Sequence, residues 1–179
     1  MTYKIEEHKH RFAAWAAGRA ASVTGCRFRV EQGKIILERV RLNNLLSTPD
    51  NLPSPKDFDT AHRQWRQEII EVAQEYGLAF THGVAAKLIN IYFKAAFVCG
   101  GYYNHTNVQA IHPPIDRKLL DELSKKDVGG LHQVWNVAKR IGWSKFNSDQ
   151  YETVIQSIRD AIQDNEPLWV VEQYWQGYQ

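Results

Sequence analysis

Apolar residues recur every three or four positions along most of this chain, which is the spacing of an amphipathic helix. In the first such stretch, Phe12, Trp15 and Arg19 fall on one face and alanine is frequent throughout. Residues 31–46 form a less regular helical region, where a strand over 34–40 is an open alternative. The pattern therefore predicts an all-α fold. The remaining predicted helices span residues 5–23, 57–76, 84–98, 117–126, 130–141, 149–163 and 167–176.

Prolines, glycines and short polar residues mark where the helices begin and end. The segment 47–57 contains three of the six prolines, so we expect a loop there that connects two lobes of one domain covering residues 1–179. Other residues fit the first positions of predicted helices. These are Asp57 or Asp59 as a cap, Asp149 with Glu152 as a capping box, and Pro167 at a first helical position.

The composition is that of a globular protein. The formal net charge of +2 leaves nucleic-acid binding open, because phosphate binding needs only a local basic face. Two cysteines are too few for a disulfide framework and no histidines have metal-ligand spacing, so we expect no metal and no other cofactor. No run approaches eighteen apolar residues, and the first residues lack the apolar core of a signal peptide. A cytoplasmic protein without a membrane span is the expectation.

The segment 81–87, which reads Thr-His-Gly-Val-Ala-Ala-Lys, carries the first candidate chemistry. Backbone N–H groups at a helix start lack intrahelical partners and attract anions, and a glycine lets a phosphate approach closely. On the helix that follows, Lys87, Asn90 and Lys94 fall on one side. Partial burial would lower the pKa of Lys87 and give a neutral, nucleophilic amine. The alternative is that both lysines belong to the solvated stripe of an amphipathic helix.

The second candidate element is Pro113-Pro114-Ile115-Asp116. The prolines fix the backbone, and Asp116 directly precedes a clear helical run. Asp116 therefore fits a helix N-cap, and a carboxylate held at the positive end of a helix stays ionised and can also serve catalysis. His112, just before the prolines, fits a hydrogen-bonded structural residue better than an acid or a base.

Together these elements resemble the helix-hairpin-helix superfamily of DNA glycosylases, in particular the 8-oxoguanine glycosylases with associated lyase activity. Those enzymes carry a Gly-Val-Gly-x-Lys hairpin, whose lysine is the nucleophile, and later a Pro-Val-Asp segment with the catalytic aspartate. This chain has Gly83-Val84-Ala85-Ala86-Lys87 and Pro114-Ile115-Asp116. A second lysine seven residues after the nucleophile, as Lys94 is here, is similar to the archaeal branch. The resemblance covers residues 77–120, and Ala85 replaces the second hairpin glycine.

The resemblance implies a two-lobed glycosylase fold, with the hairpin and catalytic helix over 77–99 and the aspartate-bearing segment over 112–126. The protein would bind double-stranded DNA and flip an oxidised purine into a pocket. Lys87 would attack the sugar C1′ and form a Schiff base, while Asp116 would stabilise positive charge on the sugar. The implied DNA-binding residues are His82, Gly83, Val84, Ala85 and Lys94. Candidates for the base pocket, by residue type, are Trp15, Trp65, Tyr102, Tyr103 and His105.

Two other classes of function stay open. The chain could keep this fold as a DNA-binding protein that has lost catalysis, which the alanine at position 85 permits. It could also be a protein-interaction module of a bacterial multi-component repair or defence system. In that case the C-terminal run 168–175 would be a docking helix for a protein partner, and otherwise it would pack on the core.

Overall fold

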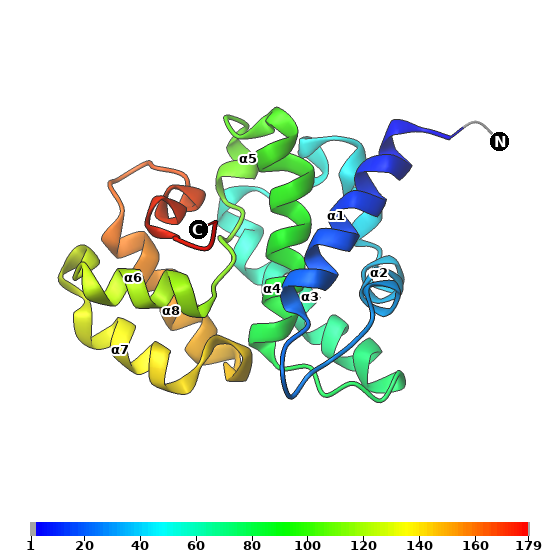
Figure 1. Cartoon of the computed structure of the whole chain (residues 1–179). Coiled ribbons are helices and arrows are strands. Elements are labelled where there is room, and N and C mark those ends of the chain that lie inside the picture. The colour runs from blue at the N-terminus through cyan, green and yellow to red at the C-terminus, as the bar shows by residue number, and fades with distance from the viewer. Residues whose placement is uncertain (1–2, 179) are drawn as a thin grey trace.

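The computed structural model describes residues 3–178, and every regular element in that range is helical (Figure 1). The predicted all-α class is confirmed, and the region 31–46 forms two helical elements with no strand. The α-helices are α1 (Ile5–Ala21), α2 (Val30–Arg39), α3 (Pro55–Glu75), α4 (His82–Phe93), α5 (Thr106–Gln109), α6 (Arg117–Lys125), α7 (His132–Ile141) and α8 (Ser148–Ala161). Shorter 3₁₀ helices are η1 (Leu42–Ser47), η2 (Pro49–Asn51), η4 (Val128–Gly130), η5 (Trp143–Lys145) and η6 (Leu168–Tyr174), and η3 (Lys94–Tyr102) is a π-helix.

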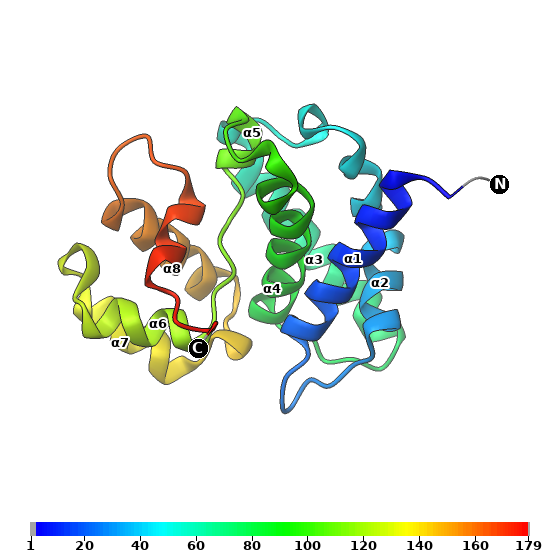
Figure 2. The same ribbon diagram turned by 45° about the horizontal axis from the view of Figure 1, so that its top comes forward.

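The buried side chains form two hydrophobic clusters, which we call the N-terminal and C-terminal lobes. The N-terminal lobe is built mainly from α1 to α4, and the C-terminal lobe from α6, α7, α8 and η6. Figures 1 and 2 show the two groups of helices side by side, with α4 between α1 and the C-terminal lobe. Trp143 packs against both clusters, and Ala86 of α4 belongs to the C-terminal one. The two lobes therefore meet along α4.

The chain crosses between the lobes at residues 112–115. Ile111 belongs to the N-terminal cluster and Ile115 to the C-terminal one, and the residues between them are buried. The segment 47–57, expected to be the inter-lobe loop, instead lies within the N-terminal lobe. Leu52 in that segment is part of the N-terminal cluster, and its carbonyl oxygen accepts a hydrogen bond from Asn107 at 3.1 Å. The prolines of 47–57 therefore turn the chain inside one lobe.

The start of α3 differs from the expected one. The helix begins at Pro55, which suits a first helical position because its missing N–H would have no intrahelical partner there. Ser54 is the N-cap, and Asp57 lies in the first turn, where it accepts a hydrogen bond from the Ser54 hydroxyl at 2.6 Å. Asp59 is not a cap either, because its carboxylate accepts from the Arg159 guanidinium at 2.6 Å.

The expected starts of the last two elements are also corrected. The capping box of α8 is formed by Asn147 and Gln150, each of whose side chains accepts a hydrogen bond from the other's backbone N–H. The predicted pair, Asp149 and Glu152, lies two residues further into the helix. Pro167 precedes η6 in an extended conformation and acts as its N-cap, rather than as the first helical residue.

Helix α4 is buried on almost every side, so its solvent-facing stripe is much narrower than the sequence suggests. Thr81 caps it by accepting the Val84 N–H at 3.1 Å, so the helix begins at His82, and at Lys94 it continues as the π-helix. The span His82–Tyr102 is long and apolar enough to cross a membrane by length and composition. Most of that span is buried inside the protein, and packing in the core accounts for its apolar character.

A buried polar network joins the two lobes beside α4. The Asn90 side chain donates to the Pro113 carbonyl oxygen at 3.0 Å and to the Tyr151 hydroxyl at 2.9 Å. It also accepts a hydrogen bond from His62 at 2.8 Å. His112 donates from Nε2 to Asp59 at 2.9 Å and accepts the Tyr151 hydroxyl at Nδ1. The prediction that His112 is a hydrogen-bonded residue is confirmed, and the network fixes the segment that carries the double proline.

Candidate functional site

The structure brings Lys87 and Asp116 together at the boundary of the two lobes. Lys87 lies in the second turn of α4, and Asp116 is the N-cap of α6, where it accepts the Leu119 N–H at 2.9 Å. The Lys87 Nζ atom lies 3.2 Å from the other carboxylate oxygen of Asp116, Oδ2. Only 5% of Lys87 is exposed, so the alternative in which it lies on a solvated stripe does not hold. The predicted N-cap role of Asp116 is confirmed.

Burial and mutual attraction have opposite effects on the pKa values of this pair. Burial lowers the pKa of Lys87 below its usual value, and the nearby Asp116 carboxylate opposes that shift without cancelling it. Burial by itself would raise the pKa of Asp116, but the Lys87 ammonium and hydrogen bonds from Leu119 and Trp175 bring it below the usual value. The site therefore holds an ionised carboxylate beside an amine that loses its proton more readily than an exposed lysine.

Residues from the C-terminal segment complete the surroundings of the pair. The Trp175 indole N–H donates to Asp116 Oδ2 at 2.9 Å. Glu172 of η6 pairs with Lys94, and the Lys94 ammonium also lies 5.8 Å from the centre of the Trp175 ring. Burial raises the pKa of Glu172, against the opposing effect of Lys94. Two lysines, Lys87 and Lys94, and two carboxylates, those of Asp116 and Glu172, thus lie together at the lobe boundary, and Trp175 covers them from the C-terminal segment.

Sequence reasoning did not find Trp175 and Glu172 as part of this site. It placed both in the run 168–175, for which the two interpretations were a docking helix and a helix packed on the core. The structure supports packing, since Leu168 and Val171 of this run are buried in the C-terminal lobe. No local motif relates this segment to Lys87, because the two are far apart in the chain and only the tertiary fold brings them together.

Trp143 of η5 is a further neighbour of the pair. Its ring centre lies 5.4 Å from the Lys87 Nζ atom, within the range of a cation–π contact. The face of an aromatic ring attracts a cation, so Trp143 is a favourable neighbour of the Lys87 ammonium. The indole also packs between the two hydrophobic clusters and closes the site from the side of η5.

Three backbone N–H groups at the start of α4 are not available to bind a phosphate, contrary to the expectation. The Gly83 N–H donates to the Phe146 carbonyl oxygen at 3.1 Å, and the amides of Val84 and Ala85 donate to Thr81. All three residues are buried. The expected phosphate contacts at Gly83, Val84 and Ala85 are therefore corrected: this turn packs against the 143–146 segment of the C-terminal lobe.

The two remaining residues expected to bind DNA are partly enclosed. His82 is half-buried, which lowers the pKa of its ring, and its Nδ1 atom has no hydrogen-bond partner. The Lys94 ammonium is paired with Glu172 and so is not free to neutralise a phosphate. Neither residue lies on an open basic surface in this structure.

The aromatic residues suggested for a base pocket are not gathered around Lys87. Trp15 lies half-exposed on the outer face of α1, and Tyr102 is exposed at the end of η3. His105 caps α5 and pairs with Asp50 at 3.1 Å. Trp65 packs edge-on against Phe93 in the N-terminal lobe. The aromatic side chains that contact Lys87 and Asp116 here include Trp143 and Trp175, neither of which was among these candidates.

Comparison of the chain with known protein families, with curated proteins and with solved structures finds no match. Within the part of the chain that the structure describes, no group of three or more His, Cys, Asp and Glu side chains could hold a metal ion. The groups that the site offers for chemistry are the two lysines, the two carboxylates and the two indoles.

Proposed function

We propose that this protein is a DNA glycosylase with lyase activity, which removes an oxidised purine of the 8-oxoguanine type from double-stranded DNA through a Schiff base at Lys87. The observation that supports the proposal is the buried contact of 3.2 Å between Lys87 Nζ and Asp116 Oδ2. Lys87 belongs to the hairpin motif and Asp116 to the proline-led motif 29 residues later, and neither motif alone requires the two side chains to touch. The choice of base rests on the sequence resemblance.

The proposed reaction uses the amine, the carboxylate and a flipped nucleotide. The neutral Nζ attacks the sugar C1′ as the C1′–N9 bond breaks, and the bonding electron pair leaves on the base, which takes up a proton. The attacking nitrogen loses a proton and the C1′–O4′ bond opens, which gives the Schiff base. Removal of a C2′ proton then expels the 3′ phosphate. Asp116 stabilises the positive charge that develops on the sugar.

The reaction requires the C-terminal segment to move. Lys87 is buried, and the Trp175 indole donates to the same Asp116 oxygen that Lys87 contacts, so we infer that a sugar reaches Nζ only when the C-terminal segment moves away. Movement of a covering segment before chemistry is common in enzymes, and it excludes water from the closed site. Trp175 and Glu172 are therefore expected to leave Asp116 and Lys94 when a nucleotide enters.

Borohydride trapping tests the proposal, because the reagent reduces a Schiff base to a stable protein–DNA adduct. The substrate is a duplex with one 8-oxoguanine, and undamaged, uracil-containing and abasic duplexes serve as comparisons. The wild-type protein is expected to form an adduct that Lys87→Gln abolishes. Lys56→Gln is the matched control, since Lys56 is an exposed lysine in the first turn of α3. An adduct that survives Lys87→Gln would place the nucleophile elsewhere, and no adduct on any duplex would refute the proposed activity.

The closure of the site also favours a second candidate, a DNA-binding or protein-interaction protein without turnover. Three amides of the hairpin are used within the protein, and the carboxylate of Asp116 already has three hydrogen-bond donors. In such a protein the pair would be a structural contact between the lobes. Lys87→Gln would then lower thermal stability and leave DNA binding unchanged, and neither the wild type nor the variant would form an adduct.

A further inference from the structure

Helix α1 carries a stripe of exposed side chains that the fold does not use. Phe12 and Trp15 are 57% and 51% exposed, and Ile5, about two turns before Phe12, is 60% exposed. Arg19 follows Trp15 by four residues on the same face. The rings of Phe12 and Trp15 contact each other, with their centres 5.9 Å apart. The half-buried Lys9 lies between Ile5 and Phe12 on this face, and we call Ile5, Lys9, Phe12, Trp15 and Arg19 the α1 stripe.

The packing of α1 is complete without this stripe. The opposite face of the helix, with Ala13, Ala14 and Ala17, is fully buried against the rest of the N-terminal lobe. His10, on the same buried side, donates and accepts hydrogen bonds with Tyr92 and Glu38. Phe12 and Trp15 are exposed to water although the interface of α1 with the lobe is complete without them. Exposed aromatic side chains of this size lower solubility, and they indicate an interaction surface.

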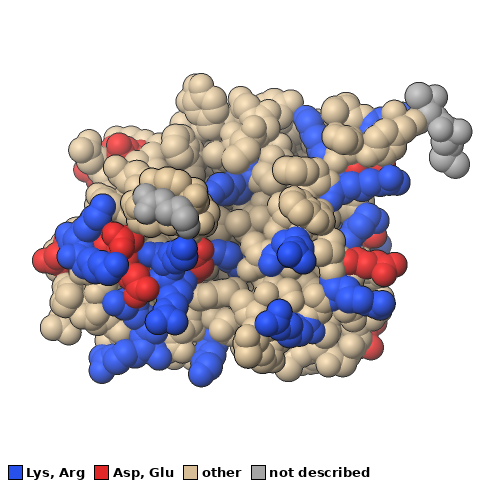
Figure 3. All heavy atoms as spheres, in the orientation of Figure 1, with Lys and Arg blue, Asp and Glu red and all other residues tan. Residues whose placement is uncertain are grey.

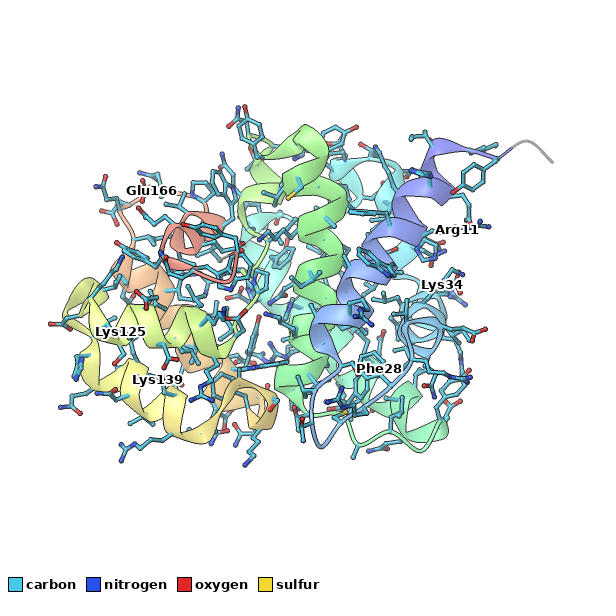
Figure 4. The ribbon with its side chains drawn as sticks, viewed as in Figure 1. Arg11, Phe28, Lys34, Lys125, Lys139 and Glu166 are labelled. Carbon is cyan, nitrogen blue, oxygen red and sulfur yellow. The ribbon has the colours of Figure 1, made fainter. Side chains whose placement is uncertain are left out.

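The charge of the stripe is positive and unpaired. Lys9 and Arg19 have no carboxylate partner among the described residues, and no acidic residue lies within the stripe. Two neighbouring cations differ in this respect: Arg11 and Lys34, labelled in Figure 4 at the outer edge of α1 and α2, are paired with Glu7 and Glu38. The two free charges therefore flank the exposed rings.

The stripe continues onto the neighbouring π-helix η3. The Lys9 ammonium lies 5.4 Å from the centre of the Tyr102 ring, and Tyr102 and the adjacent Tyr103 are both exposed. Figure 3 shows lysine and arginine side chains spread over the front of the N-terminal lobe, in the view in which α1 lies at the front. The acidic side chains on this lobe lie toward its outer edge. Exposed rings and cations thus lie side by side along α1 and onto η3.

We propose that the α1 stripe binds a single strand of DNA, with unpaired bases stacked on Phe12, Trp15 and Tyr102 and the phosphates neutralised by Lys9 and Arg19. Proteins that bind single strands combine aromatic platforms with a basic track, because every base has a face for stacking and every nucleotide carries a negative charge. A base-paired duplex offers the phosphates but hides the faces of its bases, so it would not use the aromatic rings. The choice of DNA as the ligand rests on the proposed function, but the identification of the stacking surface does not depend on it.

Binding of a fluorescently labelled twelve-nucleotide oligo-dT, measured by anisotropy, tests the proposal. The wild-type protein is expected to bind it more tightly than a duplex of equal length. Each lost stack weakens binding about five-fold or more, so a Phe12→Ala/Trp15→Ala double variant should bind about 30-fold more weakly. Arg19→Ala should reduce the slope of log K against log salt concentration by about 0.7, whereas Phe12→Ala should leave the slope unchanged. Tyr76→Ala, which removes an exposed aromatic side chain outside the stripe, is the matched control.

The outcomes separate this inference from the proposed activity. Lys87→Gln should keep wild-type affinity for oligo-dT, so loss of trapping and loss of strand binding come from different variants. Equal affinity of the double variant and the wild type would overturn the inference, even if trapping succeeds. Binding to anionic phosphatidylserine vesicles without binding to oligo-dT would assign the stripe to a membrane surface instead. A dimer that the double variant dissociates, with oligo-dT binding unaffected, would assign it to a second copy of the chain.

Discussion

Replacing Gly83 with alanine should destabilise the protein because a methyl group has no room there. A Cβ atom at this position would lie 1.8 Å from the Trp143 carbonyl oxygen and 3.3 Å from Phe146 Cβ. The 143–146 segment would have to retreat by about 1.6 Å to reach an ordinary contact distance of 3.4 Å. That movement breaks the hydrogen bond from the Gly83 N–H to Phe146 and stretches the one from the Thr81 hydroxyl to the Ser144 carbonyl oxygen.

The expected loss follows from these contacts. Overpacking costs about 1–3 kcal/mol, and each lost buried hydrogen bond costs about 0.5–1.5 kcal/mol, so Gly83→Ala should lower the free energy of unfolding by about 2–5 kcal/mol. For a chain of this length, that corresponds to a fall in Tm of roughly 5–15 °C. Thermal unfolding followed by circular dichroism at neutral pH measures it directly.

Gly100→Ala is the matched control for this measurement. Gly100 lies in η3, its nearest neighbours would be 3.8 Å and 3.9 Å from an added Cβ, and its backbone conformation is open to any residue. Its Tm should stay within about 2 °C of the wild-type value. If the Tm of Gly83→Ala also stays within about 2 °C of the wild-type value, the two lobes do not approach closely at the hairpin in solution. An open turn, with amides available to a phosphate, would then be the better description.

Two further predictions concern the buried network beside α4. Burial lowers the pKa of His62 and of His112, so below about 6.5, the usual histidine value, the unfolded chain binds more protons than the folded one, and stability must fall. Urea midpoints that stay constant from pH 7.5 to 5.5 would contradict this. Asn90→Ala removes the shared partner of His62, Tyr151 and Pro113, and should cost about 3 kcal/mol or more. Gln67→Ala, on the exposed face of α3, is the control, and equal urea midpoints for the two variants would count against the network.

The helices could be predicted from the sequence because each carries its own periodic pattern. The segment 117–126, for example, has leucines on one face and begins after Asp116, and α6 spans Arg117–Lys125. The buried character of α4 follows less directly, because the spacing of Lys87, Asn90 and Lys94 fits a partly buried edge as well as a solvated stripe. Packing from both lobes, which no local pattern encodes, decided that Lys87 is buried.

The caps were harder to predict because several polar residues compete for each helix start. At α8, Asn147 and Asp149 are both good N-cap residues, each with a suitable partner three positions later. The structure uses the earlier pair and leaves Glu152 to accept hydrogen bonds from Arg63 and Arg66 of α3. A tertiary ion pair between two helices therefore settled a choice that the local sequence left open.

Under the proposed function, the charges around the pair would give the C-terminal segment a role in activating the amine. Glu172 favours the charged form of Lys87, and Lys94 disfavours it. When the segment is displaced, Glu172 leaves with it, and the two lysines are left with the single carboxylate of Asp116. If a nucleotide then fills the space and keeps water out, burial continues to lower the pKa of Lys87 while one of the groups that raises it is gone. Loss of Glu172 would by itself lower the pKa of Lys87, and the net positive charge left at the two lysines would attract the phosphates of the strand.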